Sequence, residues 1–346
     1  MRKIGGSFDI ECTLEQDNGY FGALCPPDGG LRFMMSGRCG IYYCLEDIQA
    51  ADQKRVAYVP RYTCETVLAP FVKAGYQLRF YGVDREMRCR FDPAELDSIS
   101  VLSLCGYFGF CNYDRDFVRA CRERGVVILE DATHSLFSSG GIDPLCDYAA
   151  GSFRKWMGVS CGGFALKRSG AFDATPLPPH QRHLELRRAY LGPAGDGAFW
   201  EGEMLLRQIF DSYGGDPQSE YVMRHADLER ICRRRRENYA ALLSSLPGET
   251  RGFRPVFPTL PEGTVPCNFT VYADIRDHFQ AYLAGHGIRS STFWPLGPLV
   301  SLDGCPDEQY IYEHVISIPC DQRLDGEDMA YTASVLASYE PPHCGG

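Results

Sequence analysis

The chain has 346 residues, of which 45% are hydrophobic and 23% charged, and its net charge at pH 7 is −10. A negative balance of this size disfavours binding to nucleic acid or to an anionic membrane. The sequence has no apolar run of the roughly 18 residues that a membrane span needs, and its N-terminus lacks the apolar core of a signal peptide. We therefore expect a cytoplasmic protein that binds neither nucleic acid nor membrane.

The sixteen cysteines are scattered along the chain, with no Cys-x-x-Cys pair and no zinc-like clustering with histidine. Most of them lie in apolar runs, where a free cysteine behaves as a small hydrophobic residue. Disulfides are rare in the cytoplasm. The sequence therefore predicts reduced structural thiols and no metal site.

From residue 56 onward, strand-like apolar runs alternate with helical segments. The strands are expected at residues 56–60, 76–84, 101–110 and 126–132, and the helices at residues 64–75 and 114–125. Strand, helix and strand at this spacing predict right-handed crossovers and a mainly parallel sheet. Residues 164–170 are expected to close this sheet as an additional strand.

Residues 171–221 are different, because they are rich in proline and glycine and show no clear hydrophobic period. We expect an irregular excursion there, with one helix at residues 199–210. A long helix is expected at residues 222–246, since Ile231 and other apolar residues fall at helical spacing. Much of its arginine run at residues 233–236 is expected on the solvated face.

The C-terminal part predicts a small α/β domain. Its strands are expected at residues 269–275 and 314–320, and its helices at residues 276–287 and 325–339. The chain then divides into an N-terminal arm (residues 1–30), a large domain (residues 31–245) and a small C-terminal domain (residues 246–346).

Two features near strand ends point to one site. An apolar run ends at Glu130 and Asp131, and Lys155 follows about one strand later in a run of small residues. Ligands bind beyond the carboxyl ends of parallel strands, and neighbouring side chains of a strand point to opposite faces. Each feature alone has a structural alternative, since Asp131 could cap a helix and the Lys155 stem could lie on Trp156.

Together, the lysine and the aspartate form the pair that pyridoxal phosphate (PLP) needs. A lysine amine condenses with the cofactor aldehyde as a Schiff base, and a carboxylate keeps the pyridine nitrogen protonated. The phosphate needs backbone N–H groups at a helix start, with a hydroxyl or a cation beside them. Ser36, Gly37 and Arg38 precede a helix expected to begin near Cys39, and Ser152 offers a hydroxyl.

Several segments, in order along the chain, resemble the DegT/DnrJ/StrS family of PLP-dependent sugar aminotransferases. They are residues 36–45, 58–84, 128–138, 231–248, 283–298 and 316–329. The resemblance runs from Ser36 to Tyr339 and is poor near residues 171–221. It implies an α/β, three-layer fold of the PLP-transferase fold type I, with a mainly parallel central sheet and a smaller C-terminal α/β domain.

The resemblance also implies roles for single residues around the cofactor. Lys155 would bind the cofactor covalently, and Asp131 would partner its pyridine nitrogen. His134 stands where the family has glutamine or histidine near the ring oxygen, although a histidine satisfied in the core would fit there as well. The large domain, residues 31–245, would be the PLP-binding domain.

The phosphate would be held by Ser152 together with the turn at Gly37, Arg38 and Cys39. The segment with which the family reaches the phosphate of its dimer partner is not visible in residues 171–221. Arg38 could replace that contact with a formal charge.

A second departure concerns the aromatic residue that the family stacks on the cofactor ring. This position falls at Cys64, so the ring must find another face, for which Tyr62 or Tyr107 are candidates. Trp294 and Arg323 are possible substrate contacts for a base or a diphosphate at the mouth between the two domains.

The function implied by the resemblance is transfer of an amino group from an amino acid, expected to be glutamate, to a keto sugar, expected to be nucleotide-linked. The resemblance further implies a homodimer. Two alternatives stay open. One is a PLP enzyme of another reaction type, such as elimination, desulfuration or amino-acid chemistry. The other is a non-catalytic sensor or scaffold with the same fold, against which the presence of both Asp131 and Lys155 argues.

Overall fold

The computed structural model describes residues 2–192, 196–247 and 250–342. The strands are β1 (Gly30–Met34), β2 (Val56–Pro60), β3 (Gln77–Val83), β4 (Cys89–Arg90), β5 (Val101–Cys105), β6 (Val127–Asp131), β7 (Tyr148–Ser152), β8 (Gly163–Lys167), β9 (Phe253–Pro255), β10 (Phe269–Ala273) and β11 (Val315–Ile318). The helices are α1 (Tyr20–Leu24), α2 (Gly37–Gln49), α3 (Glu65–Lys73), α4 (Arg115–Glu123), α5 (Gln181–Leu191), α6 (Asp196–Leu206), α7 (Pro217–His225), α8 (Leu228–Ser245), α9 (Arg276–Gly285), α10 (Pro306–His314) and α11 (Gly326–Ala337). Two 3-10 turns are η1 (Pro93–Glu95) and η2 (Phe153–Lys155).

Eight strands form the large sheet in the order β1-β8-β7-β6-β5-β2-β3-β4. The strands β3, β2, β5, β6 and β7 run parallel to their neighbours. At the two sides, β8, β1 and β4 pair antiparallel. The predicted mainly parallel sheet is therefore confirmed, and the additional strand expected at residues 164–170 is β8.

Both faces of this sheet are buried, because alternate residues of a strand face different layers of helices. Ile128 of β6 packs on the side that holds α4, whereas Leu129 packs on the side that holds α2 and α3. Helix α2 approaches the sheet closely at Gly40, where a Cβ atom would lie 2.3 Å from the carbonyl oxygen of Phe164. The three-layer α/β architecture follows from this burial on both faces.

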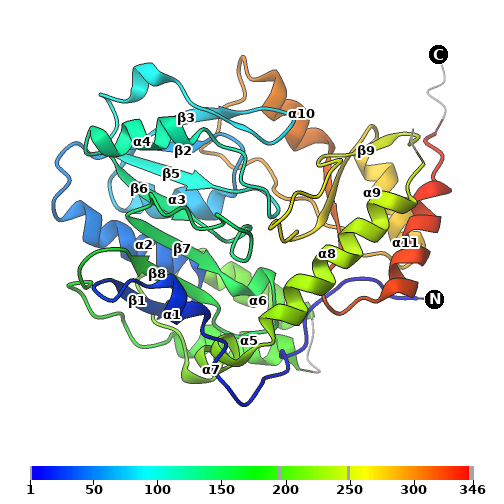
Figure 1. Cartoon of the computed structure of the whole chain (residues 1–346), viewed down its shortest axis with the longest axis horizontal. Helices are drawn as coiled ribbons and strands as arrows, with labels where there is room; N and C mark the ends of the chain where they lie inside the picture. The colour runs from blue at the N-terminus through cyan, green and yellow to red at the C-terminus, as the bar shows by residue number, and fades with distance from the viewer. Residues whose placement is uncertain (1, 193–195, 248–249, 343–346) are drawn as a thin grey trace.

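The small C-terminal sheet is antiparallel, with the order β11-β10-β9. Figure 1 shows α8, α9 and α11 beside it. The N-terminal segment is tied to this part of the molecule, because Ile4 pairs with Ile288 and Arg2 forms ion pairs with Glu327 and Asp328 of α11.

Residues 171–221 are more regular than expected. The segment contains α5, α6 and most of α7, whereas the sequence predicted a single helix at residues 199–210. Helix α7 begins with Pro217, and the side chain of Asp216 accepts a hydrogen bond from the Ser219 amide, which is a typical helix start. Helix α5 shows no apolar stripe because polar side chains, including those of His183 and Arg187, occupy buried positions.

The prediction of one long helix at residues 222–246 is wrong in one respect, because the chain forms two helices there, α7 and α8. Ala226 is extended, and Asp227 caps α8 by accepting from the Arg230 amide. The expectation that the arginine run is solvated is also wrong for Arg235, which has an exposed fraction of 0%. The predicted domain boundary at residue 246 falls at the end of α8.

The fifteen cysteines within the described residues are all free thiols. Cys344 lies outside these residues. No helix in the described part of the chain is long and apolar enough to cross a membrane.

Candidate active site

A cavity, here called the inner cavity, lies at the carboxyl edge of the large sheet beside the start of α2. The residues that line it include Ser36, Gly37, Arg38, Thr63, Cys64, Asp131, Thr133, His134, Ser152, Arg154, Lys155, Glu203, Leu206 and Trp294. Parallel strands bring Asp131 and Ser152 to this edge, because β6 and β7 run side by side in register. The structure thus brings together most of the site residues expected from the sequence.

Asp131 stands at the end of β6 and lines the cavity. Its carboxylate accepts hydrogen bonds from the amide and the hydroxyl of Thr133, at 3.0 and 2.6 Å. Burial raises the pKa of Asp131, while these hydrogen bonds and the charge of Lys155 act in the opposite direction. The carboxylate is therefore held in place by its own backbone turn.

Glu130 points to the other face of the sheet, as strand geometry requires. Its side chain is fully buried and accepts hydrogen bonds from the Asp143 amide at 2.5 Å and the Tyr113 hydroxyl at 3.2 Å. Burial raises the pKa of Glu130 to about 8. Of the two adjacent carboxylates, only Asp131 faces the cavity.

Lys155 lies in the turn η2 between β7 and the antiparallel β8. Its Nζ atom is 4.8 Å from the centre of the Phe293 ring, and its side chain lines the inner cavity. The alternative of a surface stem on Trp156 does not hold, because Trp156 is fully buried and its indole N–H donates to the Thr133 carbonyl at 2.8 Å. The amine is therefore presented to the cavity.

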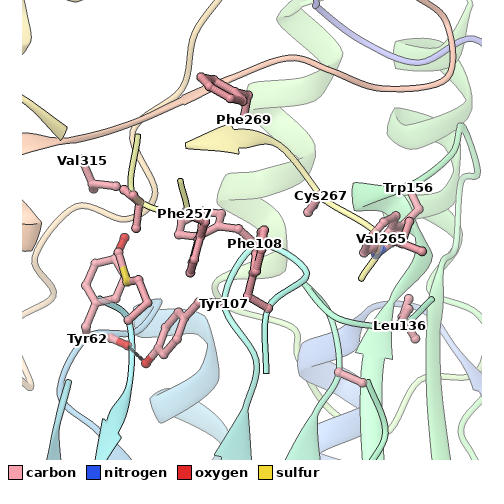
Figure 2. Packing of buried hydrophobic residues seen from close by; sticks show 14 of the residues in the cluster. Tyr62, Tyr107, Phe108, Leu136, Trp156, Phe257, Val265, Cys267, Phe269 and Val315 are labelled. Carbon is pink, nitrogen blue, oxygen red and sulfur yellow. Dashed lines mark hydrogen bonds between the residues drawn. The ribbon is translucent and has the colours of Figure 1, made fainter. Parts of the chain in front are cut away.

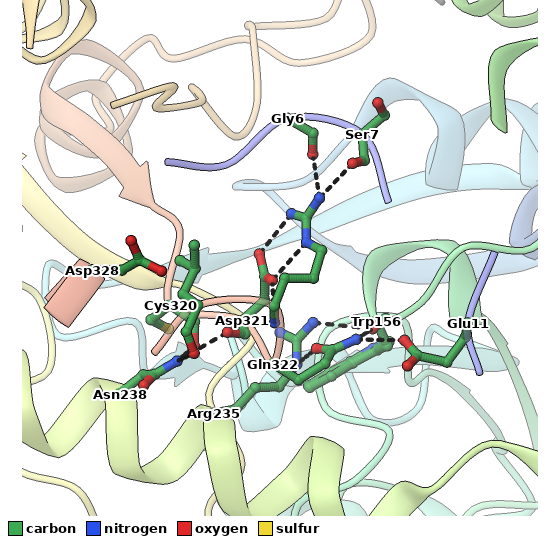
Figure 3. Close-up of polar contacts among 12 residues, drawn as sticks. Gly6, Ser7, Glu11, Trp156, Arg235, Asn238, Cys320, Asp321, Gln322 and Asp328 are labelled. Atoms are coloured by element: carbon green, nitrogen blue, oxygen red, sulfur yellow. Dashed lines mark hydrogen bonds and ion pairs between the residues drawn. The ribbon is translucent and has the colours of Figure 1, made fainter. Parts of the chain in front are cut away.

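The buried guanidinium of Arg235 fixes the backbone beside this lysine. It donates to the carbonyl oxygens of Trp156 at 3.2 Å and of Cys267 at 2.8 Å. Its Nε donates to the Gln322 side chain at 2.9 Å, and Gln322 in turn donates to the Trp156 carbonyl at 2.7 Å (Figure 3). Arg235 thus links α8 and the small domain to the Lys155 turn.

The start of α2 forms the opposite end of the inner cavity. The helix begins at Gly37, two residues before the expected Cys39. The Ser36 hydroxyl accepts from the Cys39 amide at 3.2 Å, so that amide is already engaged by the helix cap. A Cβ atom on Gly37 would lie 3.2 Å from the Gly151 backbone, so glycine lets the helix start approach Ser152.

Arg38 brings a buried positive charge to this end. Its exposed fraction is 8%, its Nη1 donates to the Leu206 carbonyl at 3.0 Å, and its guanidinium lies 5.2 Å from the Phe210 ring centre. Burial lowers the pKa of Arg38. Its Nε has no hydrogen-bond partner among the described residues. The arginine expected from the sequence to face an anion therefore lines the cavity with a donor to spare.

His134 and Trp294 lie together at the cavity wall. Their ring centres are 5.0 Å apart with an interplanar angle of 31°. Burial lowers the pKa of His134 to about 3, with a further contribution from the charge of Lys155. The Nδ1 atom of His134 has no hydrogen-bond partner in the part of the chain that the structure describes. A neutral imidazole therefore faces the site with a free nitrogen.

The two candidate stacking tyrosines lie behind the cavity. Tyr62 is fully buried and donates to the Phe293 carbonyl, and Tyr107 donates to the Tyr62 carbonyl at 2.7 Å. Figure 2 shows both in the packed core next to Phe108 and Phe257. Neither is among the residues that line the inner cavity, whereas Cys64 is. The structure thus brings Cys64, and neither of the two tyrosines, to the wall of the inner cavity.

A second, wider cavity, here called the outer cavity, continues from the inner one past Ser152, Arg154 and Lys155. The residues that line it include Gly6, Ser7, Phe8, Ser152, Arg154, Lys155, Arg187, Tyr190, Phe199, Glu203, Arg235, Asp321 and Arg323. The N-terminal arm, the α5–α6 pair and the small domain all contribute to it.

Arg323 lies in the outer cavity, but its donors are already used. Nε and Nη2 each bind the Asp321 carboxylate at 2.8 Å, and Nη1 donates to the carbonyl oxygens of Gly6 and Ser7. The guanidinium also lies 4.0 Å from the Phe8 ring centre. In the structure, this arginine therefore links the N-terminal arm to the small domain, between Gly6 and Ser7 on one side and Asp321 on the other (Figure 3).

Sequence reasoning missed three polar residues of the site. Thr133 holds Asp131, and its place two residues later in the chain was a usable signal. Arg154 and Glu203 form an ion pair at 3.6 Å at the junction of the two cavities. Arg154 adjoins Lys155 in the sequence, but nothing in the sequence places Glu203 of α6 beside it.

Neither a protein-family model nor a curated protein matches this sequence. Solved structures match its fold. CalS13, a sugar aminotransferase from Micromonospora echinospora, is 15% identical over 92% of this chain and 90% of that one, with a TM-score of 0.65. Spr1654 from Streptococcus pneumoniae in its PLP form is 14% identical over 96% and 98%, with a TM-score of 0.67. A DegT DnrJ EryC1 StrS aminotransferase from Brucella abortus is 16% identical over 88% and 84%, with a TM-score of 0.64. At these identities the likeness shows that the fold is shared.

Proposed function

We propose that the chain is a PLP-dependent aminotransferase that moves an amino group from an amino acid to a keto sugar. The observation that carries this proposal is that Lys155 and Asp131 line one cavity with the start of α2. The shared fold supports it, since all three neighbours named above are aminotransferases and one of them, Spr1654, is in its PLP form.

The residues of the inner cavity fit this cofactor. Its aldehyde needs an amine, which Lys155 presents, and its pyridine nitrogen needs a carboxylate, which Asp131 provides. Its phosphate needs a helix start and a cation, which Gly37 and Arg38 provide next to the Ser152 hydroxyl. The unpartnered Nε of Arg38 is an independent sign that an acceptor belongs at this end.

When bound, PLP supplies an electron sink for the electrons released at the α-carbon of an amino acid. The chain would provide the proton transfers around that step. The Lys155 amine, which lines the cavity, would take the proton from the α-carbon as a general base. Asp131 would keep the pyridine nitrogen protonated, and the neutral His134 would orient the ring through its free nitrogen.

The finer features of the function rest on the resemblance of the sequence motifs. We propose glutamate as the donor, a nucleotide-linked keto sugar as the acceptor and the cytoplasm as the location. We also propose a homodimer. Helix α6 supports an interface, because its large apolar side chains Trp200 and Met204 are exposed by 64% and 54%.

The test is to add PLP to the purified protein and record its visible spectrum. We expect an absorbance band that disappears on reduction with borohydride and leaves the adduct on Lys155, located by mass spectrometry. Glutamate alone should then convert the unreduced protein to its pyridoxamine phosphate form and release one equivalent of 2-oxoglutarate. An adduct on another lysine would contradict the site, and loss of water, sulfur or carbon dioxide from the substrate would contradict the reaction.

A further inference from the structure

The α5–α6 pair brings buried charges to the outer cavity that are incompletely paired. Arg187 of α5 is 5% exposed, and the side chain of Arg154 is 14% exposed. Their Nη1 atoms lie 3.5 and 3.6 Å from the same carboxylate oxygen of Glu203. Neither Nη1 atom has a hydrogen-bond acceptor among the described residues, and the Nε of Arg187 has none there either.

The cluster of Arg154, Arg187 and Glu203 has one more positive charge than negative charge. Two guanidinium groups face one carboxylate, so one positive charge is uncompensated. His183 does not change this count, because burial and the two arginines lower its pKa to about 3 and keep it neutral. Burying an unpaired charge costs folding free energy. A bound anion would remove this imbalance and accept the unused N–H groups.

The cluster also lies beside the reactive amine. Arg154, Arg187 and Lys155 all line the outer cavity. The Arg187 guanidinium lies 4.9 Å from the Tyr190 ring centre and 5.7 Å from that of Phe199, and these contacts restrict its orientation. A molecule that reaches Lys155 through this cavity therefore passes an oriented cation.

We propose that Arg154 and Arg187 form an oxyanion subsite that binds an acidic group of the substrate reacting at Lys155. The proposal rests on the proposed function, for which it assigns the residues that bind an acidic group of a substrate. A guanidinium binds a carboxylate or a phosphate through two parallel N–H bonds. The acidic group is therefore either a carboxylate of the amino donor or a phosphate of the keto acceptor.

Arg154 lines both cavities, so Arg187 is the residue that distinguishes the subsite from the place of the cofactor phosphate. The proposed partners of that phosphate are Gly37, Arg38 and Ser152, which line the inner cavity. Arg187 lines only the outer cavity. The subsite and the cofactor phosphate can therefore be tested independently.

The test compares Arg187→Gln with Arg182→Gln. Arg182 belongs to the same helix, but its side chain is 56% exposed and pairs with Glu185 and Glu201 on the surface. Calorimetry would measure the binding of succinate and, separately, of methyl phosphate to the protein loaded with PLP. We expect the wild type and R182Q to bind alike and R187Q to bind about tenfold or more weakly, as expected for loss of a charge-assisted pair.

The two probes identify the source of the acidic group. Binding of succinate alone indicates the carboxylate of the donor, and binding of methyl phosphate alone indicates a phosphate of the acceptor. Binding of both indicates a subsite that serves both half-reactions. Equal affinity of R187Q and the wild type for these probes, or no binding of either probe to the wild type, would overturn the proposal. If R187Q does not fold, Arg187→Lys keeps the charge without the planar fork and should still weaken binding.

An absorbance titration with PLP separates this proposal from the proposed function. R187Q should bind PLP as the wild type does, since Arg187 does not line the inner cavity. A large loss of PLP affinity in R187Q with unchanged anion binding would assign Arg187 to the cofactor phosphate and overturn the substrate subsite. If the wild type binds the anions through Arg187 but shows no adduct on Lys155, the proposed function fails while the subsite stands.

Discussion

The carboxyl edge of the sheet and the α5–α6 pair meet at Lys155, but they hold their polar groups differently. At the edge, Asp131 is hydrogen-bonded by the turn that follows its own strand. In the α5–α6 pair, Arg187 and His183 are buried with nitrogen atoms that have no hydrogen-bond partner among the described residues. We infer that the edge fixes the reacting groups before any ligand binds, whereas the helix pair is completed by a ligand.

Replacing Lys155 tests the edge most directly and should have the largest effect. Lys155→Ala removes the amine that would bind the cofactor and move the α-proton, so turnover should fall below detection. The spectrum should also lose the band that borohydride bleaches. Lys167→Ala is a suitable control, because Lys167 of β8 pairs with Asp47 away from the cavity. An active K155A enzyme would remove the basis of the proposed site.

Replacing the two adjacent carboxylates of β6, one at a time, separates the roles of its two faces. Asp131→Asn keeps the shape but loses the charge that would hold the pyridine nitrogen protonated. We expect kcat to fall by about two to four orders of magnitude, a size typical of losing an essential charged group at a reacting centre. Glu130→Gln should be much milder, because Glu130 faces Asp143 and Tyr113 instead of the cavity. The reverse ranking, measured by steady-state kinetics, would place the cofactor on the other face.

The same contrast explains how much the sequence could predict. Apolar strand-like runs and helical segments located β6 and α3, and the rule that ligands bind beyond the carboxyl ends of parallel strands then put Asp131 at the ligand edge. These features are local, so the chain itself encodes them. Tertiary burial decided the rest: Arg235 looked solvated within an arginine run, yet it is buried against Trp156. The sequence did not predict helix α5, because its buried positions include His183 and Arg187, which interrupt any apolar period.

The position of Cys64 shows the same limit on a smaller scale. The sequence showed that no aromatic ring stands there, but neither Tyr62 nor Tyr107, the candidates for another ring face, lines the inner cavity. Their packing into the core depends on partners such as Tyr312 and Trp294, more than 180 residues away in the sequence. No local pattern reports such contacts.

Arg235 joins the edge to the small domain, so its loss should weaken the whole molecule. Arg235→Gln would remove the guanidinium donors of the Cys267 carbonyl and of the Gln322 side-chain oxygen, whereas the Trp156 carbonyl keeps its hydrogen bond from Gln322. We expect the free energy of unfolding to fall by about 3 kcal/mol, from an unsatisfied-group cost of about 1–3 kcal/mol each. Urea unfolding would measure this change. Arg233→Gln, on the exposed face of the same helix, should change stability by less than about 0.5 kcal/mol. Equal effects of the two substitutions would show that Arg235 is not a structural link.

The smallest predicted effect is a dependence of stability on pH from Glu130. Its pKa is raised from 4.5 to about 8 by burial, so between these values the folded state keeps a proton that the unfolded state has lost. Stability should therefore fall as the pH rises through this window, with a slope of about 1.4 kcal/mol per pH unit from this group. Glu130→Gln has no proton to lose, so its unfolding free energy should decline less steeply than that of the wild type. Urea unfolding at pH 5.5, 6.5 and 7.5 would measure both slopes. Identical slopes would mean that Glu130 is ionised in the folded protein, and that its side of β6 holds a charge as readily as the side of Asp131.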